Sequence, residues 1–376
     1  MLLIRLTAFP VFAIASVIVP PAAGLYGVSL TDLEFLDTNR TDPYTGAPVR
    51  RLPVSLIQPV NPLSECQPTQ QMYMPNATAK YWEQTYEKAY GIPLNNTFSQ
   101  VVLSLCEPNH KPIREQYPLI LFSPGEGTSR QLYHVLCTNI AAQGYTVVTV
   151  DAPGEAGGFT TYLDGSTEYG NPNSTDQITS EIDVRVQDID FVLSQLSTLG
   201  AHHGHYHLNT TSPIMFGHSL GGNTALSVVI DNESFIGGLN LDGAIDGAPL
   251  NHTTTKPFMI FASDMPGALQ HNQSNSQGWA EAWRNLLGPK WQLQIKNSTH
   301  ITFTDMPVLG SLLGLYKLPG VTQILGSINP QEGLNIQVAV LSTLAGFLAG
   351  EKEVQSVVNV ATTFPEVLVV NTTNIE

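Results

Sequence analysis

Residues 217–221 read Gly-His-Ser-Leu-Gly and constrain the fold of this chain more than any other segment. An apolar run at 213–216 precedes them, and a run compatible with a helix follows at 223–231. This is the pattern of a strand, a tight turn and a helix, with Ser219 at the turn. The glycines suit such a turn because a side chain on either flank would collide with the neighbouring strand or helix. The pattern therefore predicts a serine hydroxyl at the end of a sheet, beside the N-terminus of a helix.

Apolar runs typical of strands alternate with helical runs through the middle of the chain. Because the strand runs are continuously apolar, we expect a mostly parallel sheet with helices on both faces. The expected strands span residues 54–59, 101–105, 119–122, 146–150, 214–217, 237–241, 258–262 and 291–295. The expected helices span residues 76–90, 130–142, 177–199, 223–231, 279–287 and 336–350. Together with the turn at Ser219, this order predicts the α/β-hydrolase fold.

A serine hydroxyl becomes an effective nucleophile only when a histidine accepts its proton and a carboxylate supports that histidine. In this fold the three residues follow one another as serine, acid and histidine. His300 comes directly after the expected strand 291–295 and is the predicted base. His252 and His271 also lie downstream of the serine, but both are in polar loops, and we favour neither.

Two aspartates compete for the role of the acid. Asp242 ends the strand run that follows the serine helix, and Asp264 follows the next strand run. Asp246 is a weaker third option because it sits in a turn rich in glycine, alanine and proline. The acid can stand on either strand in this fold, so spacing alone leaves Asp242 and Asp264 both open.

The oxyanion of the reaction needs two backbone N–H donors. One is expected from Leu220, the residue after the nucleophile. The other is expected from the loop 123–127, which reads Ser-Pro-Gly-Glu-Gly, with Glu126 supplying the amide. A carboxylate beside a developing negative charge is unfavourable, so we expect the Glu126 side chain to point away or to accept a fixed hydrogen bond.

Four segments resemble the secreted platelet-activating-factor acetylhydrolases, and most closely the fungal relatives. They are Tyr-Pro-Leu-Ile-Leu-Phe-Ser-Pro-Gly-Glu-Gly-Thr-Ser-Arg at 117–130, Gly-His-Ser-Leu-Gly-Gly-Asn-Thr-Ala at 217–225, Asn-Leu-Asp-Gly at 240–243 and Thr-His-Ile-Thr-Phe-Thr-Asp at 299–305. The resemblance runs from about residue 54 to about residue 318. The chain departs from the animal enzymes at 124–125, where Pro-Gly replaces His-Gly, and the part after about residue 318 has no counterpart.

The resemblance implies a catalytic set. It implies Ser219 as nucleophile, His300 as base, and Asp242 rather than Asp264 as acid, with the Glu126 and Leu220 amides as the oxyanion hole. It also implies an esterase for phospholipids with a short sn-2 acyl chain, which needs neither a metal nor another cofactor. A polyester or cutin hydrolase, with Asp264 as its acid, and a non-catalytic binding protein on the same scaffold are the alternatives.

The N-terminus has the pattern of a secretory leader. A charged start and an apolar run at 6–19 lead to Pro-Pro-Ala-Ala-Gly, so we expect residues 1–24 to be a signal peptide cleaved near Gly24. Residues 25–376 are then a single domain with an N-terminal excursion at about 60–115. Secretion also fits the glycosylation sequons at Asn39, Asn76, Asn95, Asn173, Asn209, Asn232, Asn251, Asn272, Asn297 and Asn371.

The three cysteines suggest one disulfide and one buried thiol. Cys66 and Cys106 flank the same excursion and are the expected pair, whereas Cys137 lies in a helical run and is expected in the core.

The formal net charge of −15 disfavours nucleic acid and anionic membranes as binding partners. No run beyond the leader is long and apolar enough for a membrane anchor. The resemblance implies an ester or phospholipid as the partner, met through transient contact with a lipid surface. Oligomeric state is not predicted. The histidine-rich segment 202–207 resembles a metal site, but its place in a polar loop favours a solvated segment.

Overall fold

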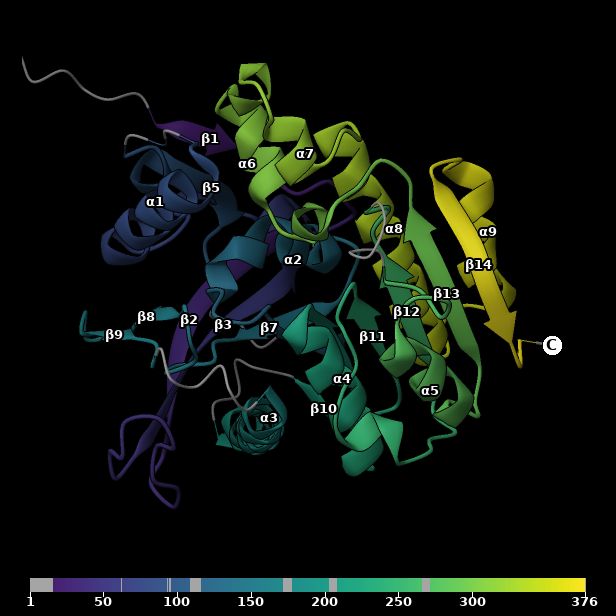
Figure 1. The fold of residues 1–376 in the computed structure, drawn as a ribbon. Helices are drawn as coiled ribbons and strands as arrows, with labels where there is room; N and C mark the ends of the chain where they lie inside the picture. The colour runs from purple at the N-terminus through teal and green to yellow at the C-terminus, as the bar shows by residue number, and fades with distance from the viewer. Residues whose placement is uncertain are drawn as a thin grey trace, which may run out of the picture.

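The computed structural model describes residues 16–61, 63–92, 94, 96–108, 116–171, 178–202, 208–265 and 271–375. Within these residues, nine strands form the main sheet in the order β14-β13-β12-β11-β10-β6-β7-β3-β2 (Figure 1). Their bounds are β2 Gly27–Asp37, β3 Arg50–Val60, β6 Pro118–Ser123, β7 Thr146–Val150, β10 Asn209–His218, β11 Gly238–Leu241, β12 Phe258–Ala262, β13 Lys290–Ile295 and β14 Val367–Thr373. The six central strands β13, β12, β11, β10, β6 and β7 run parallel to one another. β3 is antiparallel to both β7 and the edge strand β2, and the other edge strand, β14, is antiparallel to β13.

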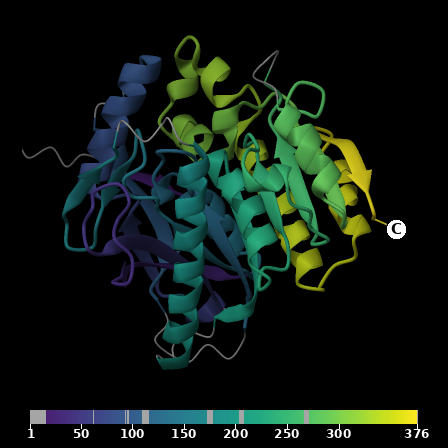
Figure 2. The same ribbon diagram turned by 60° about the horizontal axis from the view of Figure 1, so that its bottom comes forward.

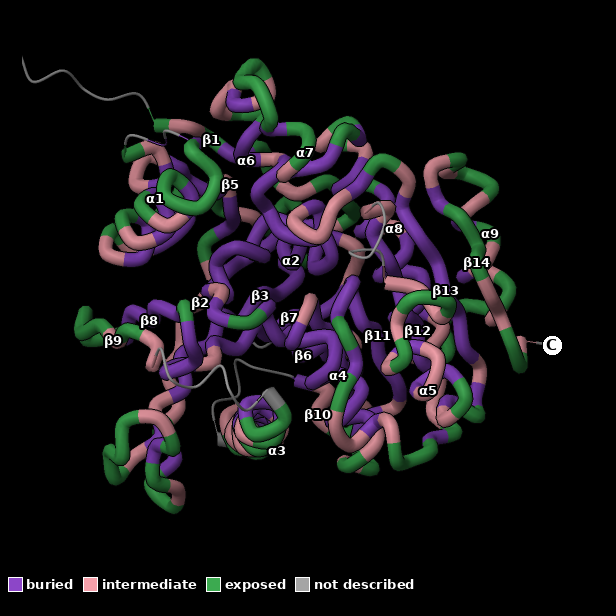
Figure 3. Tube along the Cα trace, in the orientation of Figure 1, coloured by how far each residue is buried: buried purple, intermediate pink, exposed green. Residues whose placement is uncertain are grey.

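Helices cover both faces of this sheet and give it two apolar cores. The helices α3 Ile178–His202, α4 Leu220–Asp231 and α5 Gln277–Asn285 pack on one face. Figure 2 brings this face forward. The helices α2 His134–Ala141, α8 Pro330–Leu348 and α9 Gln355–Thr363 pack on the other face. Successive residues of β6 serve opposite cores, because Leu119 belongs to the first and Ile120 to the second. The strands therefore form a buried band through the molecule (Figure 3), and the predicted α/β-hydrolase fold is confirmed.

The N-terminal excursion is a small layer beside the main sheet. It contains a sheet ordered β1-β5-β4 and one long helix. The bounds are β1 Val17–Val19, β4 Pro68–Met72, α1 Asn76–Tyr90 and β5 Val101–Cys106. The expected strand at 101–105 thus exists, but it pairs with β1 and β4 rather than with the central strands.

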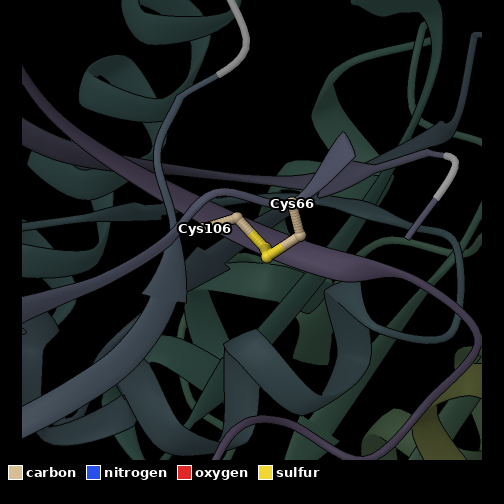
Figure 4. Close-up of a disulfide and its surroundings, with 2 residues drawn as sticks. All are labelled: Cys66 and Cys106. Carbon is tan, nitrogen blue, oxygen red and sulfur yellow. A yellow bond between two sulfur atoms is a disulfide. The ribbon is translucent and has the colours of Figure 1, made fainter. Parts of the chain in front are cut away.

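A disulfide ties the ends of this excursion together. Cys66 precedes β4 and Cys106 ends β5, and the two sulfurs are bonded (Figure 4). This confirms the pairing expected from the sequence. Cys137 is a buried free thiol in α2, also as expected.

Residues 17–24 belong to the fold, which differs from the expectation that residues 1–24 all lie outside it. β1 runs parallel to β5, and the Ala23 N–H donates to Asn139 Oδ1 over 3.0 Å. A Cβ added to Gly24 would lie 2.1 Å from the Ala142 carbonyl oxygen, so this segment packs tightly against the end of α2. The expected leader residues before position 16 lie outside the described part of the chain.

The C-terminal part of the chain contributes two short helices, α6 Met306–Leu312 and α7 Val321–Leu325, at the top of Figure 1, and the strand β14, which forms one edge of the main sheet. The remaining elements are the hairpin β8 Phe159–Thr161 and β9 Thr167–Tyr169, and the 3-10 turns Leu63–Glu65, Phe98–Gln100, Arg130–Tyr133, Ala248–Leu250, His300–Phe303 and Leu315–Lys317. No helix in the described ranges is both long and apolar enough to span a bilayer.

Candidate active site

The turn between β10 and α4 holds Ser219 in a strained backbone conformation. Its φ of 57° and ψ of −125° lie in a region that residues with a side chain rarely adopt. The Ser219 N–H donates to the Leu241 carbonyl over 2.9 Å, which fixes the turn against β11. A Cβ on Gly217 would lie 2.0 Å from the Gly221 oxygen, and a Cβ on Gly221 would lie 2.0 Å from the Ser123 oxygen. The prediction that this turn needs its glycines is confirmed.

Asp242 and His300 lie beside this turn and are hydrogen-bonded to each other. Asp242 directly follows β11, and His300 opens the 3-10 turn after β13, so both come from the carboxyl ends of parallel strands that β12 separates. His300 Nδ1 lies 2.8 Å from Asp242 Oδ2. Because a carboxylate oxygen accepts, Nδ1 carries the proton and Nε2 keeps its lone pair. The ring of His300 is partly exposed, whereas Asp242 is buried.

The environment of Asp242 keeps it ionised. Burial by itself raises the pKa of this carboxyl, but hydrogen bonds from His271 and His300 outweigh burial and lower the pKa below its usual value. The Ser263 N–H and hydroxyl also donate to it, over 2.9 Å and 2.8 Å. A charged acceptor is what an imidazolium at His300 would need.

Asp264, the alternative acid, is engaged elsewhere. Its Oδ1 accepts from Gln294 Nε2 over 3.2 Å, and its Oδ2 accepts from the Asn297 N–H over 3.0 Å. These bonds support the loop that leads to His300, and none of the hydrogen bonds of Asp264 reaches His300 itself. Asp246 is exposed, and His252 is an exposed residue whose ring bonds the Ala248 carbonyl of its own turn.

The loop after β6 lies directly against the serine. A Cβ added to Gly125 would be 3.3 Å from Ser219 Cβ, so this glycine lets the loop approach the nucleophile. The Glu126 and Leu220 amides, expected as the oxyanion hole, donate no hydrogen bond to any described residue. The Glu126 side chain is exposed, which agrees with the expectation that it points away.

A buried ion pair lies behind this loop. Arg185 of α3 makes a bidentate pair with Glu155, and both side chains are almost fully buried. The same guanidinium donates to the Ser123 hydroxyl over 2.9 Å and to the Gly125 carbonyl over 3.1 Å, and it also bonds the Pro124 carbonyl. Three successive residues of the loop are thus held by one side chain.

His218 links the oxyanion loop to the histidine loop. Its Nε2 lies 3.1 Å from the His300 carbonyl, so Nε2 carries the proton. Its Nδ1 then accepts from the Tyr133 hydroxyl at 2.8 Å, and that hydroxyl accepts the Gly125 N–H over 3.0 Å. Burial lowers the pKa of His218 well below its usual value, so the ring stays neutral.

A second imidazole approaches Asp242. His271 Nδ1 is 3.5 Å from Asp242 Oδ1, and its ring stacks on Trp279. The hydrogen bond to Asp242 raises the pKa of His271. The sequence analysis treated His271 only as a rival base, and its contact with the acid was not foreseen.

Other supporting residues were also missed, although one carried a readable signal. Arg185 stands between Ile182 and Ile189 on the apolar face of the predicted helix, and a charge in that position indicates a buried partner. The hydrogen bonds between the C-terminal part and the turn that begins at His300 had no such signal in the sequence. There, Thr302 Oγ1 donates to the Leu325 carbonyl over 3.1 Å, and Gln337 Nε2 donates to the Thr302 carbonyl over 3.0 Å.

Residues 19–195 match the family model described as platelet-activating factor acetylhydrolase, isoform II. Over 335 residues, the chain is 28% identical to a protein of Arthroderma benhamiae named probable 1-alkyl-2-acetylglycerophosphocholine esterase, with 82% of each chain covered. Over residues 19–195 the chain is therefore similar to the platelet-activating factor acetylhydrolases. These similarities support a carboxylic ester hydrolase. Of the catalytic set that the resemblance implied, Asp242 and His300 are hydrogen-bonded to each other.

A solved structure supports the fold. The ferulic acid esterase from Streptomyces cinnamoneus superposes with a TM-score of 0.77 over 95% of this chain and 100% of that chain, at 23% sequence identity. Of the metal-like histidine segment 202–207, residues 203–207 lie outside the described residues, and nothing is described of the side chain of His202.

Proposed function

We propose that this chain is a secreted serine esterase that hydrolyses short-chain carboxylic esters, including the sn-2 acetyl ester of a glycerophosphocholine lipid. The hydrogen bond between Asp242 and His300, beside a serine on a strained turn, is the observation that carries this proposal. The substrate class rests on the family and on the name of the fungal relative.

In acylation, Ser219 attacks the ester carbonyl carbon while His300 Nε2 accepts the hydroxyl proton. The imidazolium is stabilised by Asp242, and the oxyanion accepts hydrogen bonds from the Glu126 and Leu220 amides. His300 then returns the proton to the alcohol as the carbon–oxygen bond breaks. Water repeats these steps on the acyl-enzyme and releases the acid.

The first test is the activity of the purified protein on p-nitrophenyl esters from acetate to palmitate, beside Ser219→Ala. We expect activity biased to short chains and its loss in the variant. An active Ser219→Ala protein would exclude the serine mechanism. Absence of activity in the wild type on every chain length, and on an acetylated glycerophosphocholine lipid, would contradict the proposed substrate class.

Two matched variants test the acid. Asp242→Asn removes the charge that supports His300, so we expect kcat to fall by about 10³- to 10⁴-fold. Asp264→Asn changes a residue that bonds only the supporting loop, so we expect a loss below about tenfold in kcat. The reverse order would assign the acid to Asp264, as expected of a polyester or cutin hydrolase.

Secretion is part of the proposal and is supported by the apolar leader, the sequons and the Cys66–Cys106 disulfide, a bond typical of oxidising compartments. N-terminal sequencing of protein from the culture medium would locate the cleavage. Because residues 17–24 pack into the fold, a start after Gly24 would mean that β1 is removed. Retention of the whole product inside the cell would contradict secretion.

A further inference from the structure

Asp242 contacts two imidazoles on its two carboxylate oxygens. His300 lies on Oδ2, and His271 lies on Oδ1. We propose that Asp242, His271 and His300 bind a Zn²⁺ ion, and that zinc held there inhibits the esterase reversibly. The inhibitory part rests on the proposed function, because it requires His300 to be the catalytic base.

The distances suit a small tetrahedral ion. One ligand atom from each of the three residues can be chosen so that all lie within 4.8 Å of one another. Zinc bonds to histidine and carboxylate ligands are about 2.0–2.2 Å long, so two ligands of a tetrahedral ion stand about 3.4 Å apart. The observed separations from Asp242 are 2.8 Å to His300 Nδ1 and 3.5 Å to His271 Nδ1. These two contacts are to different carboxylate oxygens, and the full set of ligand atoms lies within 4.8 Å, so side-chain movements on the order of 1 Å would bring the three ligands to tetrahedral spacing.

The donor set favours zinc over the hard cations. Two imidazoles and one ionised carboxylate form a nitrogen-rich set, whereas Ca²⁺ and Mg²⁺ prefer oxygen ligands and higher coordination numbers. Asp242 already accepts hydrogen bonds from His300 and from the Ser263 N–H and hydroxyl, and the ring of His271 lies 3.5 Å from its other oxygen. The fourth position would be taken by water.

His271 is held in place for this role. Its ring stacks on Trp279 with the centroids 5.6 Å apart, and the Trp279 indole donates to the Gly243 carbonyl over 2.8 Å. Its Nδ1 is buried and lies 3.5 Å from the carboxylate, at the outer limit of a hydrogen bond, so its contact with Asp242 is weak. A polar atom in that position gains a partner when an ion enters between the ring and the carboxylate.

Zinc on His300 Nδ1 would stop catalysis by changing the tautomer of the ring. The ion takes the Nδ1 lone pair, so the single proton of the neutral ring must move to Nε2 through solvent. Nε2 then cannot accept the proton of Ser219, and Asp242 is bound to the metal rather than to the ring. No bond to substrate is involved, so we expect zinc to lower kcat.

The activity test is a titration of p-nitrophenyl acetate hydrolysis with Zn²⁺, Mg²⁺ or Ca²⁺, followed by a chelator. We expect inhibition by Zn²⁺ alone and recovery after chelation. His271→Gln should raise the half-inhibitory zinc concentration by about tenfold or more, since even second-shell partners of a metal contribute 10- to 100-fold to its affinity. His252→Gln, an exposed histidine in another loop, is the matched control and should leave that concentration unchanged.

Calorimetric titration of Zn²⁺ into Ser219→Ala separates the site from the function. If Ser219→Ala binds Zn²⁺ and Ser219→Ala/His271→Gln does not, the result supports the metal site. If, in addition, the wild-type protein has no esterase activity, the site stands and the proposed function is contradicted. Active wild-type enzyme with no zinc binding, or with zinc inhibition that His271→Gln leaves unchanged, would overturn the site. Equal thermal stability of the two proteins would exclude misfolding as the cause of lost binding.

Discussion

Arg185 sets the shape of the oxyanion loop although it touches no reacting atom. A fully buried guanidinium is costly unless its donors are paired, and here they are shared between Glu155 and three successive loop residues. In the proposed mechanism, the loop can therefore present the Glu126 amide to the substrate without rearranging during the reaction. This pre-organisation is the usual source of oxyanion stabilisation.

Arg185→Lys tests this positioning role. Lysine keeps the charge but loses the planar fork, so it cannot hold Glu155 and the loop carbonyls together. We expect kcat to fall by about 10- to 100-fold, as for displacements of about 1 Å in other active sites, while KM changes little. Arg284→Lys, at an exposed position of α5, is the control. A kcat unchanged in Arg185→Lys would show that the loop holds its shape without the guanidinium.

At the scale of elements, the Cys66–Cys106 disulfide constrains the N-terminal excursion. Cys66 and Cys106 are 40 residues apart, and they enclose β4, α1 and β5. A cross-link restricts the unfolded chain more strongly as its loop lengthens. The excursion also meets the main core, since Leu105 and Phe98 belong to the same cluster as α2. Its order should therefore affect stability more than chemistry.

We expect Cys66→Ala/Cys106→Ala to lower the free energy of unfolding by about 2–5 kcal/mol, measured by urea denaturation. Activity at low temperature should remain, because the site lies at the ends of other strands. A reducing agent should destabilise the wild type but not the double variant, since the remaining Cys137 is buried. Equal stability of wild type and double variant would contradict the expected contribution.

The central elements were predictable because their residues face one environment. β12 is continuously apolar and buried, β7 and residues 119–123 of β6 are buried and mostly apolar, and the limits of α1 at Asn76 and Tyr90 match the expected helix. The edge strands β2 and β14 were missed because their residues face two environments, the protein and solvent. β2 and β14 mix apolar and polar residues because one side or end is solvated, so their pattern resembles a loop.

The site was predictable wherever chain order and turn chemistry determine position. Ser219 is marked by its glycines, and His300 by its place after a late strand. The choice between Asp242 and Asp264 depended on which carboxylate reaches the His300 ring. The two aspartates follow adjacent strands, β11 and β12, and only the three-dimensional structure shows that the one after β11 makes this contact. His271 and Arg185 act through contacts between segments far apart in sequence, and local pattern does not encode such contacts.

For the whole molecule, Asp305 is the junction between three parts. It accepts the Val135 and Leu136 amides at the start of α2, over 2.8 Å and 3.0 Å, and the hydroxyl of Tyr73 from the excursion over 2.9 Å. It also immediately precedes α6, close to the catalytic histidine in sequence. One buried carboxyl thus joins the excursion, a core helix and the loop that carries His300.

Burial raises the pKa of Asp305 to about 7, although the donated hydrogen bonds lower it in part. An aspartate in the unfolded chain titrates near 3.8. The folded state therefore holds this proton more tightly, and its contribution to stability is full below the unfolded pKa and is lost as the pH rises to about 7. Above that pH the contribution is constant. The change is on the order of a few kcal/mol.

Asp305→Asn removes this titration. We expect the variant to be less stable throughout, because its NH₂ group faces an amide donor, but to lose less stability than the wild type between pH 4 and pH 7. The measurement is the free energy of unfolding in urea across this pH range, for both proteins. The difference between the two values removes the effect of the net charge of −15, because the two proteins differ by only one charge. Tyr73→Phe keeps the carboxyl and removes one donor that lowers its pKa, so the step should move to higher pH. If Asp305→Asn shows the same pH dependence as the wild type, Asp305 does not titrate in this range, and its three donors outweigh its burial.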